Sequence, residues 1–206
     1  MLFRSEYFKS KSIDNNNYTN NGDGWHIDIK WDSPDYKVFY NSLYSWKIPS
    51  NSNLGKTTLS YTPAILKTIS SDELAYWRTL KVRHARSKSS LIYNQDFLNS
   101  NRSIDIDDAY VLVEDLIQTT DSGKEYLFLS PLDVIDIVGL SKKDSNDLID
   151  RLINLIVNNP CSYSHQWMPN QLLLTINRLY PHKVTVDFDP LSRILWRVWA
   201  GLKLTK

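Results

Sequence analysis

Residues 126–158 constrain the fold of this chain more than any other stretch. Ser130 is suited to cap a helix, and Pro131 then occupies the first helical position, where its missing N–H costs nothing. Gly139 stands where a left-handed residue ends a helix, and Ser141 can cap the next one. Apolar residues then recur every three and four positions up to residue 156. Two helices joined by a glycine turn are a helix-turn-helix, which is the arrangement we predict here.

The segment upstream extends this pattern. Residues 105–117 place apolar side chains on one helical face, residues 119–123 form a turn cluster, and residues 125–129 alternate as a strand. The order of helix, short strand, helix, glycine turn and long helix resembles the winged-helix superfamily, from about Asp105 to Asn158. The resemblance implies a domain that reads DNA or docks onto a protein.

The charges of the second predicted helix favour protein docking. Lys142 and Lys143 open this helix, but Asp144, Asp147 and Asp150 follow them. Affinity for duplex DNA comes largely from basic side chains that neutralise phosphates, and phosphates repel an acidic face.

The remaining segments complete an α+β fold class. Residues 25–31 alternate strictly, with Trp25, Ile27, Ile29 and Trp31 on one face, which predicts a strand in a small antiparallel, aromatic-rich sheet. A basic helix is predicted from Ser70 onward. We also predict a helix from Pro169 and an amphipathic helix over residues 191–204. We place a β region with its basic helix in residues 1–101 and a mainly helical, winged-helix-like domain in residues 102–206.

The basic stretch, residues 78–88, is the best candidate for a nucleic-acid surface. It lies beside Tyr76 and Trp77, so it could neutralise phosphates and stack a base. The alternative is a solvated helix end whose cations favour the helix dipole. The candidate nucleic-acid-binding residues, with the two lysines of the second helix, are Arg78, Lys81, Arg83, His84, Arg86, Lys88, Lys142 and Lys143.

No sequence pattern identifies an enzyme. Asp28-Ile29-Lys30 matches the D-x-K half of a metal-dependent nuclease core, but alternating polar residues on a surface strand explain it equally well. Cys161 and His165 lack the further ligands that zinc needs. Phosphate-binding glycine loops and nucleophile elbows are absent from the sequence. We therefore predict no catalytic residue, no metal and no cofactor.

Composition and aromatic content complete the functional prediction. The chain of 206 residues has a net charge of +1, one cysteine, and neither an apolar membrane span nor a secretory signal. These features predict an intracellular protein, and the basic run favours the nucleus. The 7 tryptophans and 12 tyrosines exceed the needs of a modest core. The sequence thus predicts a non-enzymatic complex subunit whose protein partner forms a hetero-complex or a homo-oligomer with it, without membrane contact. Nucleic-acid binding is the alternative. The candidate interface residues are Trp25, Trp31, Trp196 and Trp199.

Overall fold

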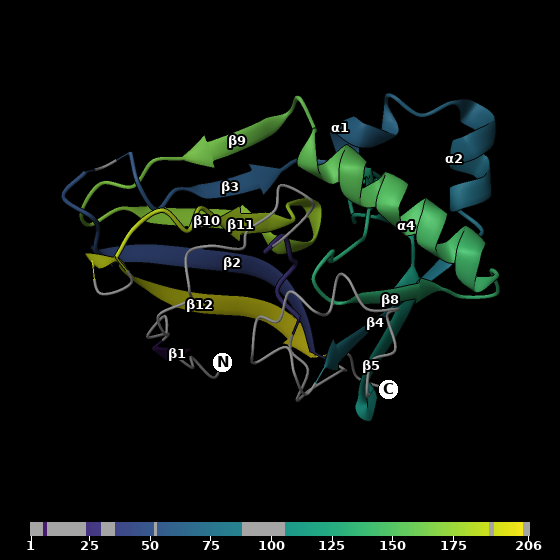
Figure 1. The fold of residues 1–206 in the computed structure, drawn as a ribbon, viewed down its shortest axis with the longest axis horizontal. Coiled ribbons are helices and arrows are strands. Elements are labelled where there is room, and N and C mark those ends of the chain that lie inside the picture. Colours follow the sequence, from purple (N-terminus) through teal and green to yellow (C-terminus); the bar gives the residue numbers. More distant parts are fainter. Residues whose placement is uncertain are drawn as a thin grey trace.

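The structure, a computed structural model, describes residues 6–7, 24–29, 36–51, 53–87, 106–189 and 192–203. Two antiparallel sheets form one side of the molecule (Figure 1). The larger sheet has the strand order β1 (Glu6–Tyr7), β12 (Ile194–Lys203), β2 (Tyr36–Lys47), β10 (Leu172–Ile176). The smaller sheet has the order β11 (His182–Val184), β3 (Thr57–Ser60), β9 (Ser162–His165).

A second group of elements lies beside these sheets (Figure 1). Its strands are a sheet in the order β5 (Ile106–Asp115), β4 (Lys81–Ser87), β8 (Val134–Ile137), and a hairpin of β6 (Ile117–Thr119) with β7 (Glu125–Leu127). The helices are α1 (Thr62–Leu66), α2 (Ser71–Trp77), α4 (Lys142–Val157) and the short 3-10 helix η2 (Asn177–Leu179).

The main core lies under α4. Ile149, Leu152 and Ile156, spaced by three and four residues, are fully buried on one face of this helix. Trp25 and Ile27 belong to the same buried cluster. The short segment 24–29 is therefore anchored in the core through alternate side chains, and His26 and Asp28 point away from that anchor.

The predicted helix-turn-helix is wrong in its first half. Residues 131–133 form a turn, and the next four residues form β8, which pairs with β4. Gly139 does adopt a left-handed conformation with φ of 84°, but it joins a strand to a helix. Ser141 caps α4 as expected, because its Oγ accepts a hydrogen bond of 3.2 Å from the N–H of Asp144.

Other predicted helices are also strands. Residues 106–115 form β5, the helix predicted from Ser70 divides into α2 and β4, residues 172–176 form β10, and residues 194–203 form β12. Each of these strands pairs with a partner distant in sequence, and such pairing overrides local helical spacing. The described chain is mostly sheet, so the mainly helical winged-helix domain is wrong.

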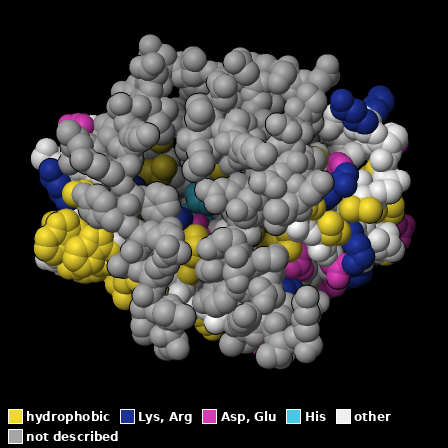
Figure 2. All heavy atoms as spheres, turned by 90° about the horizontal axis from the view of Figure 1, so that it is seen from below, with side chains coloured by type: hydrophobic (Ala, Val, Ile, Leu, Met, Phe, Trp, Pro, Cys, Tyr) yellow, Lys and Arg dark blue, Asp and Glu magenta, His cyan; other side chains and the backbone are white. Residues whose placement is uncertain are grey.

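The surface seen from below carries a hydrophobic group at one end and mixed charges at the other (Figure 2). Among the exposed apolar side chains, Trp46 and Trp196 stack with their ring centroids 4.9 Å apart. Within the described ranges, no helix is both long and apolar enough to cross a membrane.

Candidate metal centre

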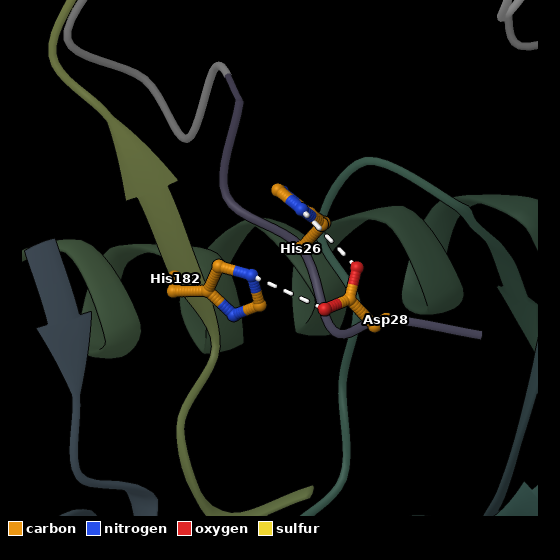
Figure 3. Close-up of side chains that lie close together, drawn as sticks. All are labelled: His26, Asp28 and His182. Carbon is orange, nitrogen blue, oxygen red and sulfur yellow. Dashed lines mark ion pairs between the residues drawn. The ribbon is translucent and has the colours of Figure 1, made fainter. Parts of the chain in front are cut away.

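His26, Asp28 and His182 converge on one point (Figure 3). His26 and His182 form an isolated antiparallel bridge, with hydrogen bonds of 2.9 Å and 2.8 Å between their backbone N–H and C=O groups. Residues paired in this way direct their side chains to the same face of the sheet. Asp28, two residues after His26, directs its carboxylate to that face as well. One possible ligand atom from each residue lies within 4.8 Å of the others.

Both imidazoles present Nε2 to the shared point. The Nδ1 of His26 bonds to the carbonyl of Gly24 at 2.8 Å, and the Nδ1 of His182 to the carbonyl of Tyr180 at 3.2 Å. A backbone carbonyl only accepts, so each Nδ1 carries a proton, and in the neutral tautomer each Nε2 keeps its lone pair. Burial, with the nearby ring of His26, lowers the pKa of His182 to about 4, so this imidazole is neutral at pH 7. Neutral imidazoles held through Nδ1 are ready metal ligands.

Asp28 supplies the anionic ligand. Its side chain is buried, its Oδ1 accepts a bond of 2.7 Å from the Nη1 of Arg197, and its Oδ2 has no hydrogen-bond partner. Burial alone would raise the pKa of Asp28, but the proximity of His182 and Arg197 outweighs burial and lowers it. The carboxylate is therefore ionised, and its unsatisfied oxygen lies 3.6 Å from the Nε2 of His182.

This donor set fits a divalent metal ion. Two imidazole nitrogens and one carboxylate oxygen form the 2-His-1-carboxylate triad that binds non-haem iron(II) and leaves coordination positions open. An unpartnered buried carboxylate oxygen is costly without a cation, so its environment favours occupancy by metal. His26, Asp28 and His182 are therefore the residues that would hold the ion.

A half-buried arginine, Arg193, bonds to a residue farther along the sheet that carries His182. Thr57 is two residues from Leu59, which pairs with His182 across the β3–β11 ladder, so Thr57 shares the face of His182. The Oγ1 of Thr57 accepts hydrogen bonds from the Nε1 of Trp167 at 3.0 Å and from the Nη2 of Arg193 at 3.1 Å. A hydroxyl has two acceptor lone pairs and one proton, so the O–H of Thr57 is left to donate.

Arg193 forms no ion pair with a carboxylate of the described residues. Its guanidinium lies over the ring of Phe188 at 5.3 Å, and its Nε is buried without a hydrogen-bond partner. Burial lowers the pKa of Arg193 to about 10, although the charge of Asp187 opposes this effect. A guanidinium with a buried Nε beside a hydroxyl that can donate is suited to bind a carboxylate.

His84 supports the segment 24–29, which carries His26 and Asp28, through a chain of hydrogen bonds. Its Nε2 accepts a hydrogen bond of 3.0 Å from the N–H of Ser130, whose Oγ in turn accepts one of 3.1 Å from the N–H of Ile27. Ile27 lies between two of the metal ligands, so this chain of bonds ties the ligand segment to β4. Burial and the charge of Arg178 lower the pKa of His84 to about 3.

The lowered pKa of His84 predicts that acid destabilises the folded protein. The folded state protonates His84 less readily than the unfolded chain, so its contribution to stability is complete above pH 6.5 and is lost as the pH falls toward 3. We expect the free energy of unfolding to fall by about 2 kcal/mol between pH 7 and pH 5 through this residue. Denaturant unfolding of His84→Gln, which keeps an acceptor for Ser130 but cannot titrate, measures the effect. An equal loss in both proteins would assign it to another group.

The comparisons with known proteins identify the family. The model of the family described as "Taurine catabolism dioxygenase TauD, TfdA family" matches residues 3–199. The chain belongs to this family. No curated protein matches it.

Solved structures share the fold of the TauD/TfdA chain. An alpha-ketoglutarate-dependent taurine dioxygenase of Burkholderia xenovorans superposes with a TM-score of 0.74 at 18% identity, over 97% of this chain and 61% of that one. A 2,4-D dioxygenase of the same organism gives 0.67 at 20% identity, over 88% and 69%. AAD-2, solved with Mn(II) and N-oxalylglycine, gives 0.68 at 19%, over 88% and 68%. The chain thus spans about three fifths of the length of the taurine dioxygenase.

Family membership corrects the functional predictions from sequence. The winged-helix resemblance is wrong, and so are the non-enzymatic docking subunit and its nucleic-acid-binding alternative, because TauD/TfdA proteins are described as dioxygenases. The partners predicted with them, a protein complex or a nucleic acid, are overturned by the same finding. The intracellular, nuclear location stays a prediction.

Most of the candidate nucleic-acid-binding residues are ion-paired or buried in the structure. Ion pairs join Arg78 to Glu125 at 2.7 Å, Lys81 to Asp115 at 2.5 Å, Lys143 to Asp147 at 2.7 Å, and Arg83 to Asp136. His84 is completely buried, and Lys142 is exposed at the start of α4. Arg86 lies in β4, its side chain outside the described part, and Lys88 lies outside the described residues.

The candidate interface tryptophans also divide. Trp25 is buried in the core, with 2% of its surface exposed, so it offers no interface. Trp196 is 44% exposed. Trp199 is half-buried, with the guanidinium of Arg197 over its ring at 4.3 Å. Trp31 lies outside the described residues.

Sequence reasoning missed the metal ligands, although half of the signal was local. His26-Ile27-Asp28 is an H-x-D pair on one face of an alternating segment. The D-x-K interpretation used Asp28 and Lys30 and left His26 out. His182 carries no local signal, because the β-bridge and the β3–β11 ladder bring it to the site. Arg193 carries none either, because its partner Thr57 is 136 residues away in sequence.

Proposed function

We propose that this chain is a 2-oxoglutarate-dependent non-haem iron(II) oxygenase. The observation that carries the proposal is the convergence of His26, Asp28 and His182, with the Nε2 of each imidazole and an unpartnered carboxylate oxygen close to one another. Family membership and the printed names of the structural neighbours support the same chemistry. Iron(II) bound there would supply the redox chemistry that allows molecular oxygen to react.

The chain's own residues bind and orient the co-substrate. Arg193 and Thr57 donate hydrogen bonds to one carboxylate of 2-oxoglutarate, and burial strengthens these bonds by excluding water. Thr57 lies two strand residues, or about 7 Å, from the position level with His182. That span matches a five-carbon dicarboxylate with its keto acid end at the metal ligands.

The proposed reaction is balanced by its own reactants. 2-Oxoglutarate and O₂ give succinate and CO₂, with one oxygen atom entering succinate and the second passing to a C–H bond of the other substrate. Arg197, which bonds to Asp28 and covers Trp199, keeps the carboxylate ligand ionised and oriented beside the co-substrate.

The test is metal-dependent co-substrate binding and turnover by the purified chain. We expect one Mn(II) or Fe(II) ion per chain, tighter binding of N-oxalylglycine after metal is added, and succinate formation that needs iron(II), O₂ and 2-oxoglutarate together. Titration calorimetry and product analysis measure these quantities. A chain that binds neither metal nor N-oxalylglycine would overturn the proposal.

A further inference from the structure

Asn177 bonds to the backbone of Asp28 in both directions. Its Oδ1 accepts a hydrogen bond of 3.0 Å from the N–H of Asp28, and its Nδ2 donates to the carbonyl of Asp28 at 2.8 Å. The second Nδ2 proton goes to the carbonyl of Val38 in β2 at 3.2 Å. Asn177 is 1% exposed, so these bonds form away from water.

These bonds replace a missing strand partner. The pairing of His26 with His182 is a single bridge, and Asp28 lies beyond it, outside any strand. In an antiparallel sheet, an N–H and a C=O of a residue are satisfied by the neighbouring strand. For Asp28 one amide side chain, 149 residues away in sequence, satisfies both.

Asn177 is itself held in place, and it lies on the segment that carries a second metal ligand, His182. Asn177 opens η2, and five residues later the same segment carries His182. The next residue, Arg178, fixes η2 through bonds to Gln118 at 2.7 Å and Tyr126 at 3.2 Å. Its guanidinium also lies over the ring of Phe128 at 4.3 Å. Asn177 therefore joins the carboxylate ligand to the segment that carries a histidine ligand.

We propose that Asn177 is a positioning residue of the metal centre, which sets the place of the Asp28 carboxylate relative to His182 without touching the metal. The inference rests on the proposed function, since it assumes that His26, Asp28 and His182 bind a metal. Groups that orient metal ligands in this way change metal affinity by about 10–100-fold when they are removed.

Asn159 provides a matched control in the same chain. It is also buried, its Nδ2 donates to Ser60 at 3.0 Å and Tyr61 at 2.9 Å, and its Oδ1 accepts from the N–H of Cys161 at 3.0 Å. Each asparagine thus makes three hydrogen bonds, but those of Asn159 contact no metal ligand. Substituting either by alanine removes the same chemistry from the interior.

The experiment compares Mn(II) affinity and metal-free stability in Asn177→Ala, Asn159→Ala and the unaltered chain, by calorimetry and denaturant unfolding. We expect Asn177→Ala to weaken Mn(II) binding by about 10–100-fold, and Asn159→Ala to change it less than about threefold. Asn177→Asp keeps the acceptor for the N–H of Asp28 and loses both donors, so its Mn(II) affinity should fall by at least about tenfold. This variant decides the question if Asn177→Ala does not fold.

Each outcome separates the inference from its premise. Equal Mn(II) affinity in Asn177→Ala and Asn159→Ala would overturn the positioning role while leaving the metal centre intact. Loss of folded structure in both Asn177 variants would also overturn the positioning role, since Asn177 would then be needed for the whole fold. An unaltered chain that binds no Mn(II) would refute the proposed function itself.

Discussion

Replacing Arg193 by methionine is expected to weaken binding of N-oxalylglycine by at least about 100-fold and to leave Mn(II) affinity unchanged. The Nε of this guanidinium is buried, and truncating one partner of a buried hydrogen-bonded charge pair costs about 2–5 kcal/mol. Each 1.4 kcal/mol corresponds to a tenfold change in affinity. Calorimetry with N-oxalylglycine and Mn(II) measures both affinities on the same protein.

The same substitution should not destabilise the ligand-free protein. Arg193 is a half-buried cation without a described ion-pair partner, and its Nε is buried and makes no hydrogen bond. Removing such a group relieves the cost of burying it, so we expect the free energy of unfolding to stay constant or to rise by about 1 kcal/mol. A residue kept at a cost to the fold is typical of a binding site.

Arg151→Met is the matched control. Arg151 lies on α4, pairs with Glu73 at 2.8 Å and is 54% exposed, so its removal should change neither ligand binding nor stability by much. N-Oxalylglycine binding of ordinary strength by Arg193→Met would remove Arg193 from the co-substrate site. A stability loss of more than about 2 kcal/mol would instead assign it a structural role through Thr57.

Local signals predicted the points where the chain turns better than the elements between them. Gly139 is left-handed and Ser141 caps α4, as the sequence indicates. The apolar residues of β5 and β8 also suit a helical face, and only their pairing with β4 makes them strands. Since β4 lies about 20 to 50 residues away from these strands, no local pattern contains that information. The division of the chain near residue 101 stays a prediction.

The charges of the basic stretch show the same limit. Arg78 and Arg83 look unpaired in the sequence, yet Glu125 and Asp136 lie beside them in the fold. Their partners stand 47 and 53 residues further along the chain. A run of cations predicts a phosphate-binding surface only where the fold leaves it without carboxylates.

The metal site could be predicted in part. Alternation in residues 25–29 correctly separates a buried face from a polar one, and the polar face carries H-x-D. The third ligand required the tertiary structure, because 154 residues separate His182 from Asp28, as 182 − 28 = 154. Local periodicity cannot bring together the buried His182 and Asp28.

Asp28→Asn is expected to have the largest effect on the metal centre, a loss of Mn(II) affinity of at least about 100-fold. Asparagine keeps the size of the side chain, and the backbone bonds to Asn177 do not involve the carboxylate. The substitution removes the anionic ligand of the triad, so it should exceed the 10–100-fold expected for a group that only orients a ligand.

Metal-linked stability gives a second measurement. A ligand at 100 times its dissociation constant stabilises the folded state by about 2.7 kcal/mol, which for a chain of this size raises the melting temperature by about 5–10 °C. We expect this rise in the unaltered chain and its absence in Asp28→Asn. Asp136→Asn also removes an aspartate that pairs with an arginine, here Arg83, but it supplies no metal ligand, so the rise should persist. A full metal-dependent rise in Asp28→Asn would place the ion elsewhere, because a centre that retains only His26 and His182 has no anionic group to hold a divalent cation.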